Sequence, residues 1–205
     1  MFTDKALTRH IQDANSDGGY GRWKQVRQFI VRGIHKDGTF LDVGCANGFL
    51  MQCLLHWSSY HLIPYGVDNR EEVIEKAKLL LPEYADHFQC IDGDHLEKLG
   101  EVSMPLQYDF VYRNYWKRDV DTAEKVHSIV TKLWEHVSSD GRMILGVYWG
   151  SNHPKGSEEE KKSHESFLQF IERIKTGAGK VDGEAFSESG FHWIMWIDKT
   201  KNTSS

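Results

Sequence analysis

The residues Leu41-Asp42-Val43-Gly44-Cys45-Ala46-Asn47-Gly48 carry the strongest structural signal in the chain. An apolar strand pattern ends at Gly44, and the helical pattern of residues 49–56 follows at once. Gly44 and Gly48 permit backbone conformations that a side chain would block, and the small Ala46 lets a ligand approach the backbone. A helix that starts here offers free N–H groups. The stretch therefore predicts a ligand-binding loop, with an ordinary strand–turn–helix connection as the alternative.

Outward from this loop, strand and helix patterns alternate along the chain. Strands are predicted over residues 39–44, 61–68, 87–91, 108–113 and 142–149, and two further strands close the chain at 180–186 and 192–198. Helices are predicted over residues 49–56, 69–81, 121–137 and 157–174. This alternation predicts an α/β fold with a parallel sheet and helices on both faces, in which the two closing strands pair antiparallel.

Local signals refine these boundaries. Helix starts are predicted at Asn69 with Glu72, at Asp121 with Glu124 and at Ser157 with Glu160. Pro64 and Gly66 predict an irregular start to the second strand, and residues 138–141 (SSDG) predict a turn before the fifth. The buried face of the last helix is predicted to consist of Phe167, Leu168, Ile171 and Ile174.

The composition indicates one globular domain. The chain has 205 residues, 40% of them hydrophobic, with 25 Lys and Arg against 30 Asp and Glu and a net charge of −5. These values suit a single domain and exclude collagen-like, disordered and disulfide-scaffold classes. Three cysteines, no apolar run of bilayer length and no secretory signal predict a cytoplasmic protein without a membrane partner. The mild acidity disfavours a nucleic-acid partner but leaves room for a local basic patch.

Two acidic positions follow later strands. Asp68 ends the second strand, 24 residues after Gly44. In doubly wound sheets an acid about 20 residues after the glycine loop accepts hydrogen bonds from ribose hydroxyls, and a helix cap is the alternative. The stretch Asp92-Gly93-Asp94-His95 follows the third strand, where a carboxylate can accept a hydrogen bond from an exocyclic amine, and a polar turn is the alternative. With the glycine loop, these acids predict a nucleoside site along the carboxyl ends of adjacent strands.

Together these motifs resemble those of the class I S-adenosylmethionine-dependent methyltransferases. The matching stretches are, in chain order, LDVGCANGFL, YGVDNR, CIDGDHL, YDFVYRNYW and SSDGRMILGVYW. The resemblance covers residues 23–198 and implies a Rossmann-like, doubly wound, seven-stranded sheet in the order 3-2-1-4-5-7-6, mostly parallel with a C-terminal antiparallel hairpin. Residues 1–22 remain as an N-terminal segment that could form a lid, and residues 199–205 as a flexible tail.

The resemblance also implies S-adenosylmethionine as the cofactor and a set of binding residues. These are Asp42, Gly44, Cys45, Ala46, Asn47, Gly48, Asp68, Asn69, Asp94, His95 and Arg113. The methionine part and the ribose of the cofactor would lie over the backbone of residues 44–48. Asp42 would lie beneath this loop, towards the amino group of the cofactor. Asp68 would accept hydrogen bonds from the ribose hydroxyls, and the residue after it would lie beside the adenine. Asp94 would bind the adenine amine, and Arg113 would lie near the sulfonium.

The acceptor is predicted to be a small molecule. Aromatic residues follow strands four and five, where ligands bind in open α/β sheets, and they predict an aromatic-walled pocket, with core packing as the alternative. They are Tyr115, Trp116, Tyr148 and Trp149. The sequence RNYW at 113–116 lacks the prolines of the N/D-P-P-Y-like motif of nucleic-acid amino-methylating enzymes, which disfavours a DNA adenine target and leaves RNA open. Candidate general bases, each with a structural role as the alternative, are His153, His95 and His192.

The N-terminal segment could close over the cofactor. Glycines at 18, 19 and 21 would permit a hinge there. Tyr20 and Arg22 would then cover the cofactor. A lid of this kind predicts that removal of residues 1–21 weakens cofactor or acceptor binding.

Two other functions remain open from the sequence. A nicotinamide-dependent dehydrogenase would need glycine at position 46 and glycine or alanine at position 49, where the chain has Ala46 and Phe49. The second is a non-catalytic protein that retains the nucleoside site for regulation or as a partner subunit. Nothing in the sequence excludes it. The sequence predicts no metal site and leaves open whether the protein is a monomer or a homodimer.

Overall fold

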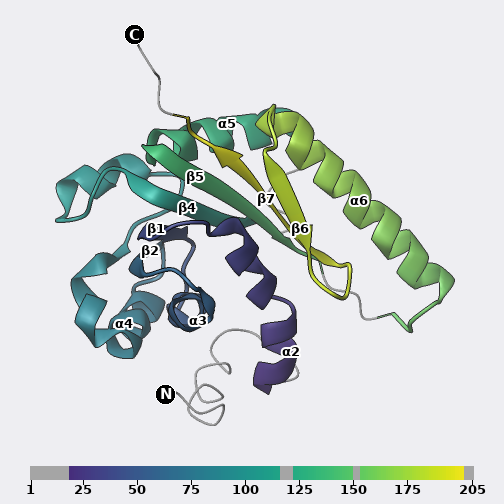
Figure 1. Ribbon diagram of the computed structural model, residues 1–205, viewed down its shortest axis with the longest axis horizontal. Coiled ribbons are helices and arrows are strands. Elements are labelled where there is room, and N and C mark those ends of the chain that lie inside the picture. The colour runs from purple at the N-terminus through teal and green to yellow at the C-terminus, as the bar shows by residue number, and fades with distance from the viewer. Residues whose placement is uncertain (1–18, 116–121, 150–152, 201–205) are drawn as a thin grey trace.

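The computed structural model describes residues 19–115, 122–149 and 153–200 and shows a twisted sheet between two layers of helices (Figure 1). Its strands are β1 (Gly38–Val43), β2 (Leu62–Asp68), β3 (Phe88–Cys90), β4 (Tyr108–Tyr115), β5 (Val137–Tyr148), β6 (Gly183–Phe186) and β7 (His192–Asp198). They are ordered β3-β2-β1-β4-β5-β7-β6. The first five strands run parallel, while β7 pairs antiparallel with both β5 and β6. The predicted fold class and strand order are confirmed.

Helices cover both faces of this sheet. The α-helices are α2 (Gly19–Gln25), α3 (Phe49–Trp57), α4 (Glu71–Leu80), α5 (Ala123–Glu135) and α6 (Glu158–Ala178). The 3-10 helices are η2 (Gln28–Gly33), η3 (Pro82–His87) and η4 (Leu96–Glu101). Figure 1 shows α5 and α6 on one face, with α2, α3 and α4 on the other.

The hydrophobic core is divided by the sheet into two layers. Side chains of a strand alternate between its faces, so in β4 Val111 and Tyr115 join the cluster under α5 and α6, whereas Phe110 and Tyr112 join the cluster under α3 and α4. A third, smaller cluster joins α2 to α3. Its buried members are Tyr20, Trp23, Phe49 and Cys53.

The strand register brings several loops to one edge. Val43, the last residue of β1, is in register with Val67 of β2 and Arg113 of β4. The carboxyl ends of these strands therefore lie side by side, as expected for the ligand-binding edge of an open α/β sheet.

The helix starts differ in part from the predictions. Arg70 caps α4 without a side-chain hydrogen bond, so the predicted cap by Asn69 and Glu72 is wrong. Helix α5 is capped by Thr122, whose hydroxyl accepts from the N–H of Lys125; Asp121 lies outside the described residues. Helix α6 confirms the prediction, because the Ser157 hydroxyl accepts from the backbone N–H of Glu160.

The strands also depart from the predictions at two places. Residues 138–141 do not form a turn but belong to β5, where the pairing jumps from Tyr108–Val137 to Phe110–Arg142 and forms a bulge. Strand β2 is regular through Pro64 rather than irregular at its start. The Pro64 carbonyl is hydrogen-bonded to Nδ1 of His87 (3.0 Å), which precedes β3. The pairing of β2 with β3 starts only at Gly66, so a backbone N–H at position 64 would have no strand partner on that side.

Two further expectations about the C-terminal region are corrected. Leu168 is exposed, and Phe170 takes its place on the buried face of α6, because the buried positions are spaced by three, one and three residues. Lys199, expected at the start of a flexible tail, donates from its backbone N–H to Gly141 and from its ammonium group to the carbonyls of Trp134 and Val137.

Candidate functional site

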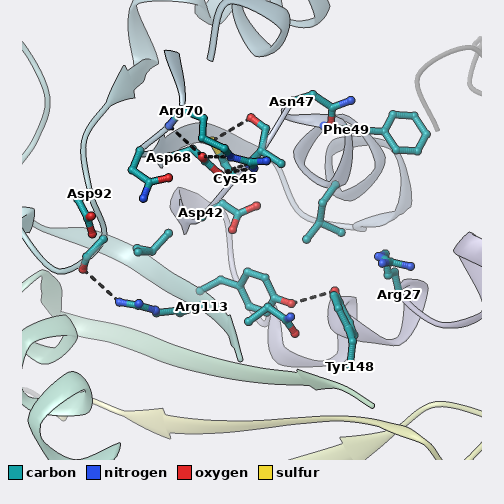
Figure 2. Close-up of a pocket in the computed structure, with 18 of the residues that line it drawn as sticks. Arg27, Asp42, Cys45, Asn47, Phe49, Asp68, Arg70, Asp92, Arg113 and Tyr148 are labelled. Atoms are coloured by element: carbon teal, nitrogen blue, oxygen red, sulfur yellow. Dashed lines mark hydrogen bonds and ion pairs between the residues drawn. The ribbon is translucent and has the colours of Figure 1, made fainter. Parts of the chain in front are cut away.

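A cavity of about 700 Å³ opens at the carboxyl ends of the parallel strands (Figure 2). Eight of the predicted cofactor-binding residues line it: Asp42, Gly44, Cys45, Ala46, Asn47, Asp68, Asn69 and Arg113. In Figure 2, Asp68, Arg70 and Asp92 lie at one end, which we call the acidic end. Arg27 and Tyr148 lie at the opposite end. Together with Trp23, which contacts Arg27, and Tyr112, which is hydrogen-bonded to Tyr148, they form what we call the aromatic end. Asp42 lies between the two ends.

The loop of residues 44–48 is held by β2. The backbone N–H groups of Gly44 and Cys45 both donate to the Val67 carbonyl, and the N–H of Ala46 donates to Asp68 Oδ2 (3.0 Å). Ala46 has a φ of 48°, the one positive value at a non-glycine residue in the described part of the chain. A left-handed conformation is unfavourable for a residue with a Cβ, so these hydrogen bonds maintain a conformation that the chain would not adopt alone.

Gly48 supports the loop but does not line the cavity. Its φ is 72°, and a Cβ built on it would lie 3.0 Å from Ala77 Cβ of α4. The residue therefore lets the start of α3 approach α4 closely. The sequence prediction placed Gly48 against the cofactor, whereas the structure gives it a packing role.

Asp68 is already saturated with hydrogen bonds. It is 6% exposed, and Oδ1 accepts from the backbone N–H (3.2 Å) and Nε (2.9 Å) of Arg70. Oδ2 accepts from Ala46 and from Arg70 Nη2 (3.2 Å). A carboxylate has about four acceptor sites, so a ribose hydroxyl can reach Asp68 only if Arg70 gives up a contact. The side chain of Arg70, which the sequence analysis missed, is 52% exposed and has room to move.

Asp42 lies in the wall with little exposure to solvent. It is 3% exposed, and burial, followed by the nearby negative charge of Asp68, raises its pKa to about 7. Burial and the same two aspartates raise the pKa of Cys45 well above its usual value, so this thiol stays protonated. A cation bound in the cavity would stabilise the ionised form of Asp42.

Asp92, rather than the predicted Asp94, faces the cavity from the loop after β3. Asp92 Oδ1 accepts from the backbone N–H of Asp94 (2.9 Å), and this bond lowers the pKa of Asp92. The turn directs the Asp94 side chain to Arg113 (3.3 Å), where it is 60% exposed. His95 is bonded to Glu97 through Nδ1 (3.0 Å) and also lies outside the wall.

The aromatic end contains a tyrosine pair and an arginine. The hydroxyls of Tyr112 and Tyr148 are hydrogen-bonded to each other (2.9 Å), and burial raises the pKa of both. The guanidinium carbon of Arg27 lies 4.6 Å from the ring centroid of Trp23 and 4.5 Å from that of Tyr148. Asn114 Oδ1, in the same wall, is buried and has no hydrogen-bond partner among the described residues.

No protein-family model matches the chain, and no curated protein sequence matches it. Its fold, however, is similar to that of several solved methyltransferases. A S-adenosylmethionine-dependent methyltransferase from Aquifex aeolicus is 16% identical over 98% of this chain and all of that chain, with a TM-score of 0.57. The chain has the class I S-adenosylmethionine-dependent methyltransferase fold.

Two larger proteins with this methyltransferase fold illustrate its size range. The mitomycin 7-O-methyltransferase MmcR is 18% identical, with a TM-score of 0.60; the match covers 95% of this chain and 57% of MmcR. The calicheamicin-biosynthesis methyltransferase CalO1, solved with S-adenosylhomocysteine bound, is 20% identical, with a TM-score of 0.55 and coverage of 83% and 52%. This chain thus spans little more than half the length of either protein.

Within this methyltransferase fold, only part of the predicted aromatic wall lines the main cavity. Tyr148 lines the cavity, but Tyr115 is fully buried in the core. Trp149 packs against Phe167 and lines a second cavity of about 520 Å³, next to Tyr148. Trp116 lies outside the described residues. Tyr112, three residues before Tyr115 and on the opposite face of β4, lines the main cavity together with Tyr148.

None of the candidate bases lines the main cavity. His153 lines the second cavity, His192 is buried beside the Tyr148 ring at 5.6 Å, and His95 points towards Glu97. In the described part of the chain, no group of three or more side chains could hold a metal ion, and no helix is long and apolar enough to cross a membrane.

The N-terminal segment is described only from residue 19, so the lid formed by residues 1–22 stays a prediction. Gly19–Gln25 is helix α2 instead of a hinge. Tyr20 is buried, its ring contacts Phe49, and its hydroxyl accepts from Trp57 Nε1 (3.3 Å). The side chain of Arg22 lies outside the described residues. The residues of this region that reach the cavity are Trp23 and Arg27, which the sequence analysis did not select.

Proposed function

We propose that this protein is a S-adenosylmethionine-dependent methyltransferase that acts on a small molecule. The observation that carries the proposal is the placement of loop 44–48, Asp68 and Asp92 around one cavity at the carboxyl ends of β1, β2 and β3. Carboxylates at this edge are the groups that bind the ribose of a nucleoside in open α/β sheets.

The dimensions and chemistry of the cavity fit this cofactor. A volume of about 700 Å³ lies within the range of small-molecule sites. Asp92 and Asn69 offer acceptor and donor atoms at the acidic end, where the adenosine would lie. Asp42, whose pKa is raised to about 7, would meet the cofactor's positively charged end and would ionise more readily beside it. The contacts of Arg70 with Asp68 are the one feature that must rearrange.

The chemistry requires positioning more than acid–base catalysis. The bound cofactor would supply a methyl group on a sulfonium, which an acceptor takes by in-line displacement. Residues of the aromatic end would orient the acceptor, because proximity and exclusion of water account for much of the rate enhancement in such reactions. Tyr112 and Tyr148, which both line the cavity, present their hydroxyls for this purpose.

A small acceptor fits this end better than a nucleic-acid base within a duplex. The wall is formed by Trp23, Arg27 and Tyr148, which enclose the space from α2, from the turn after it and from the end of β5. The dehydrogenase alternative is disfavoured, since Phe49 is 1% exposed and packs its ring 4.7 Å from that of Trp23 at the position where that fold requires glycine or alanine.

Calorimetry and methyl transfer test the proposal in two steps. We expect S-adenosylhomocysteine and S-adenosylmethionine to bind with micromolar affinity and NAD not to bind. Incubation with labelled S-adenosylmethionine and a metabolite extract should then yield a labelled small molecule. Binding without product across many extracts would favour the non-catalytic alternative, and absence of binding would refute the proposal.

A further inference from the structure

Arg27 is held at the aromatic end by contacts on two separate elements. Its guanidinium carbon lies within 4.6 Å of the centroid of Trp23, which belongs to α2, and within 4.5 Å of that of Tyr148, which ends β5. Both distances are well inside the range of about 6 Å for attraction between a cation and an aromatic face. Arg27 also donates a hydrogen bond to the side chain of Tyr148. A guanidinium has five N–H donors, so further donors stay available for a ligand.

Unlike the other arginines of the cavity, Arg27 has no ion-pair partner among the residues that the structure describes. Arg70 pairs with Asp68 (2.9 Å), and Arg113 pairs with Asp94 (3.3 Å). Among the ion pairs between residues that the structure describes, none includes Arg27, although its side chain is half-buried. A half-buried, conformationally restrained cation that lines a ligand cavity is suited to bind an anion.

We propose that Arg27, held against Trp23 and Tyr148, binds a carboxylate group of a ligand: that of the methyl donor's amino-acid part or one carried by the acceptor. The inference rests on the proposed function, because it concerns the same cavity.

The surrounding groups favour a carboxylate over a phosphate. The fork of a guanidinium matches both anions, but Asp42, Asp68 and Asp92 line the same cavity and would repel a dianion more strongly than a monoanion. Asp42 and Arg27 both act on the pKa of Tyr148, Asp42 raising it and Arg27 lowering it, so both lie close to that ring. A carboxylate next to Arg27 and an ammonium next to Asp42 would fit an α-amino acid.

An acceptor carboxylate is the other source with the same chemistry. Tyr148 lines both the main cavity and the second cavity, which lies towards the start of α6. A molecule that enters along this side would reach Arg27 without contacting the acidic end.

The first arm of the test uses S-adenosylhomocysteine and its carboxamide, which differ only in the carboxylate. If the methyl donor supplies the carboxylate, wild-type protein should bind the acid about 10- to 100-fold more tightly than the amide, as expected for a charged hydrogen-bonded pair. Arg27→Gln should remove this preference, and Arg27→Lys should retain part of it. Arg32→Gln, which removes an exposed arginine at the end of η2, should leave the preference unchanged.

The second arm uses protein saturated with S-adenosylhomocysteine and compares benzoate with benzamide. If the acceptor supplies the carboxylate, the acid and amide in the first arm should bind equally, benzoate should bind about tenfold more tightly than benzamide, and Arg27→Gln should equalise the two. A preference in either arm that depends on Arg27 supports the inference and names its source. If Arg27→Gln changes neither comparison while S-adenosylhomocysteine still binds, the inference is wrong; if wild-type protein binds no S-adenosylhomocysteine, the proposed function fails instead.

Discussion

The two ends of the cavity are built in different ways. The acidic end consists of residues at the end of β2 or within two residues after β2 or β3, so each is positioned by its strand. The aromatic end unites Trp23 and Arg27 with Tyr148, which lies more than a hundred residues later in the chain. A site made from strand ends depends on local sequence, and a site made from distant segments depends on the packing of the whole domain. The acidic end therefore suits a cofactor that is the same for all proteins with this fold. The aromatic end suits an acceptor that differs from one protein to another.

The largest effect is expected from the titration of Asp42, which lies between the two ends, on the free energy of unfolding. Its pKa is about 7 in the folded protein and 3.8 in the unfolded chain, so the folded state keeps a proton that the unfolded state releases between pH 4 and 7. The free energy of unfolding should therefore fall across this window, by about 2–4 kcal/mol at roughly 1.4 kcal/mol per pKa unit.

Urea denaturation at pH 5 and pH 7.5 measures this loss. Asp42→Asn, which cannot titrate, should show a smaller decrease over the same range than the wild type. Equal decreases in the two proteins would show that Asp42 is not the group responsible.

A pair of substitutions at the acidic end separates Asp92 from Asp94. Asp92→Ala should weaken S-adenosylhomocysteine binding about 10- to 100-fold, because a charged acceptor at the cavity wall is lost. Asp94→Ala, which removes a side chain directed to Arg113, should change the affinity by less than about threefold. Calorimetry distinguishes the two, and the reverse order of effects would restore the sequence-based prediction.

The loop that supports the acidic end should tolerate a methyl group at one glycine better than at another. Gly44 and Gly48 both have positive φ values, but a Cβ on Gly44 meets no atom within 4 Å, whereas one on Gly48 meets Ala77 at 3.0 Å. Gly44→Ala should cost about 1 kcal/mol of unfolding free energy through backbone strain. Gly48→Ala should cost about 2 kcal/mol, because it adds a steric clash. Equal losses of unfolding free energy in the two variants would mean that helix α4 shifts to accommodate the added methyl group at little cost.

The smallest effect is expected at the aromatic end. Tyr148→Phe removes the hydrogen bond to the buried Tyr112 hydroxyl and should destabilise the protein by about 1 kcal/mol. Tyr60→Phe, at an exposed position, serves as the matched control. Thermal unfolding of both variants measures the difference, and an unchanged melting temperature for Tyr148→Phe would argue against a tight tyrosine pair.

The alternation of strand and helix patterns predicted the parallel sheet, and the resemblance to the methyltransferases implied the strand order. Local patterns predicted most of the acidic end. Gly44 and Asp68 were found from their places after apolar strands. Asp92 and Asp94 could not be told apart, since both occupy one short loop and the hydrogen bond from Asp94 N–H to Asp92 decides which side chain turns outward. Residues 138–141 have the composition of a turn, but pairing with β4 holds them in a bulged strand.

Arg27 could not have been found in the same way. The one available signal is that it follows Trp23 by four residues and so shares its side of a helical pattern. Its partner Tyr148 becomes a neighbour only when β5 is placed beside β4 in the folded sheet. Arg70 was missed for a different reason: nothing in the sequence indicates that it folds back onto the preceding aspartate.

A crystal structure with S-adenosylhomocysteine tests the central claim most directly. The account predicts that the adenosine lies at the acidic end between loop 44–48 and Asp92, that its ribose displaces at least one Arg70 contact from Asp68, and that the amino-acid part points towards Asp42. Electron density for the nucleoside at the aromatic end, or a ribose that makes no contact with Asp68, would contradict it.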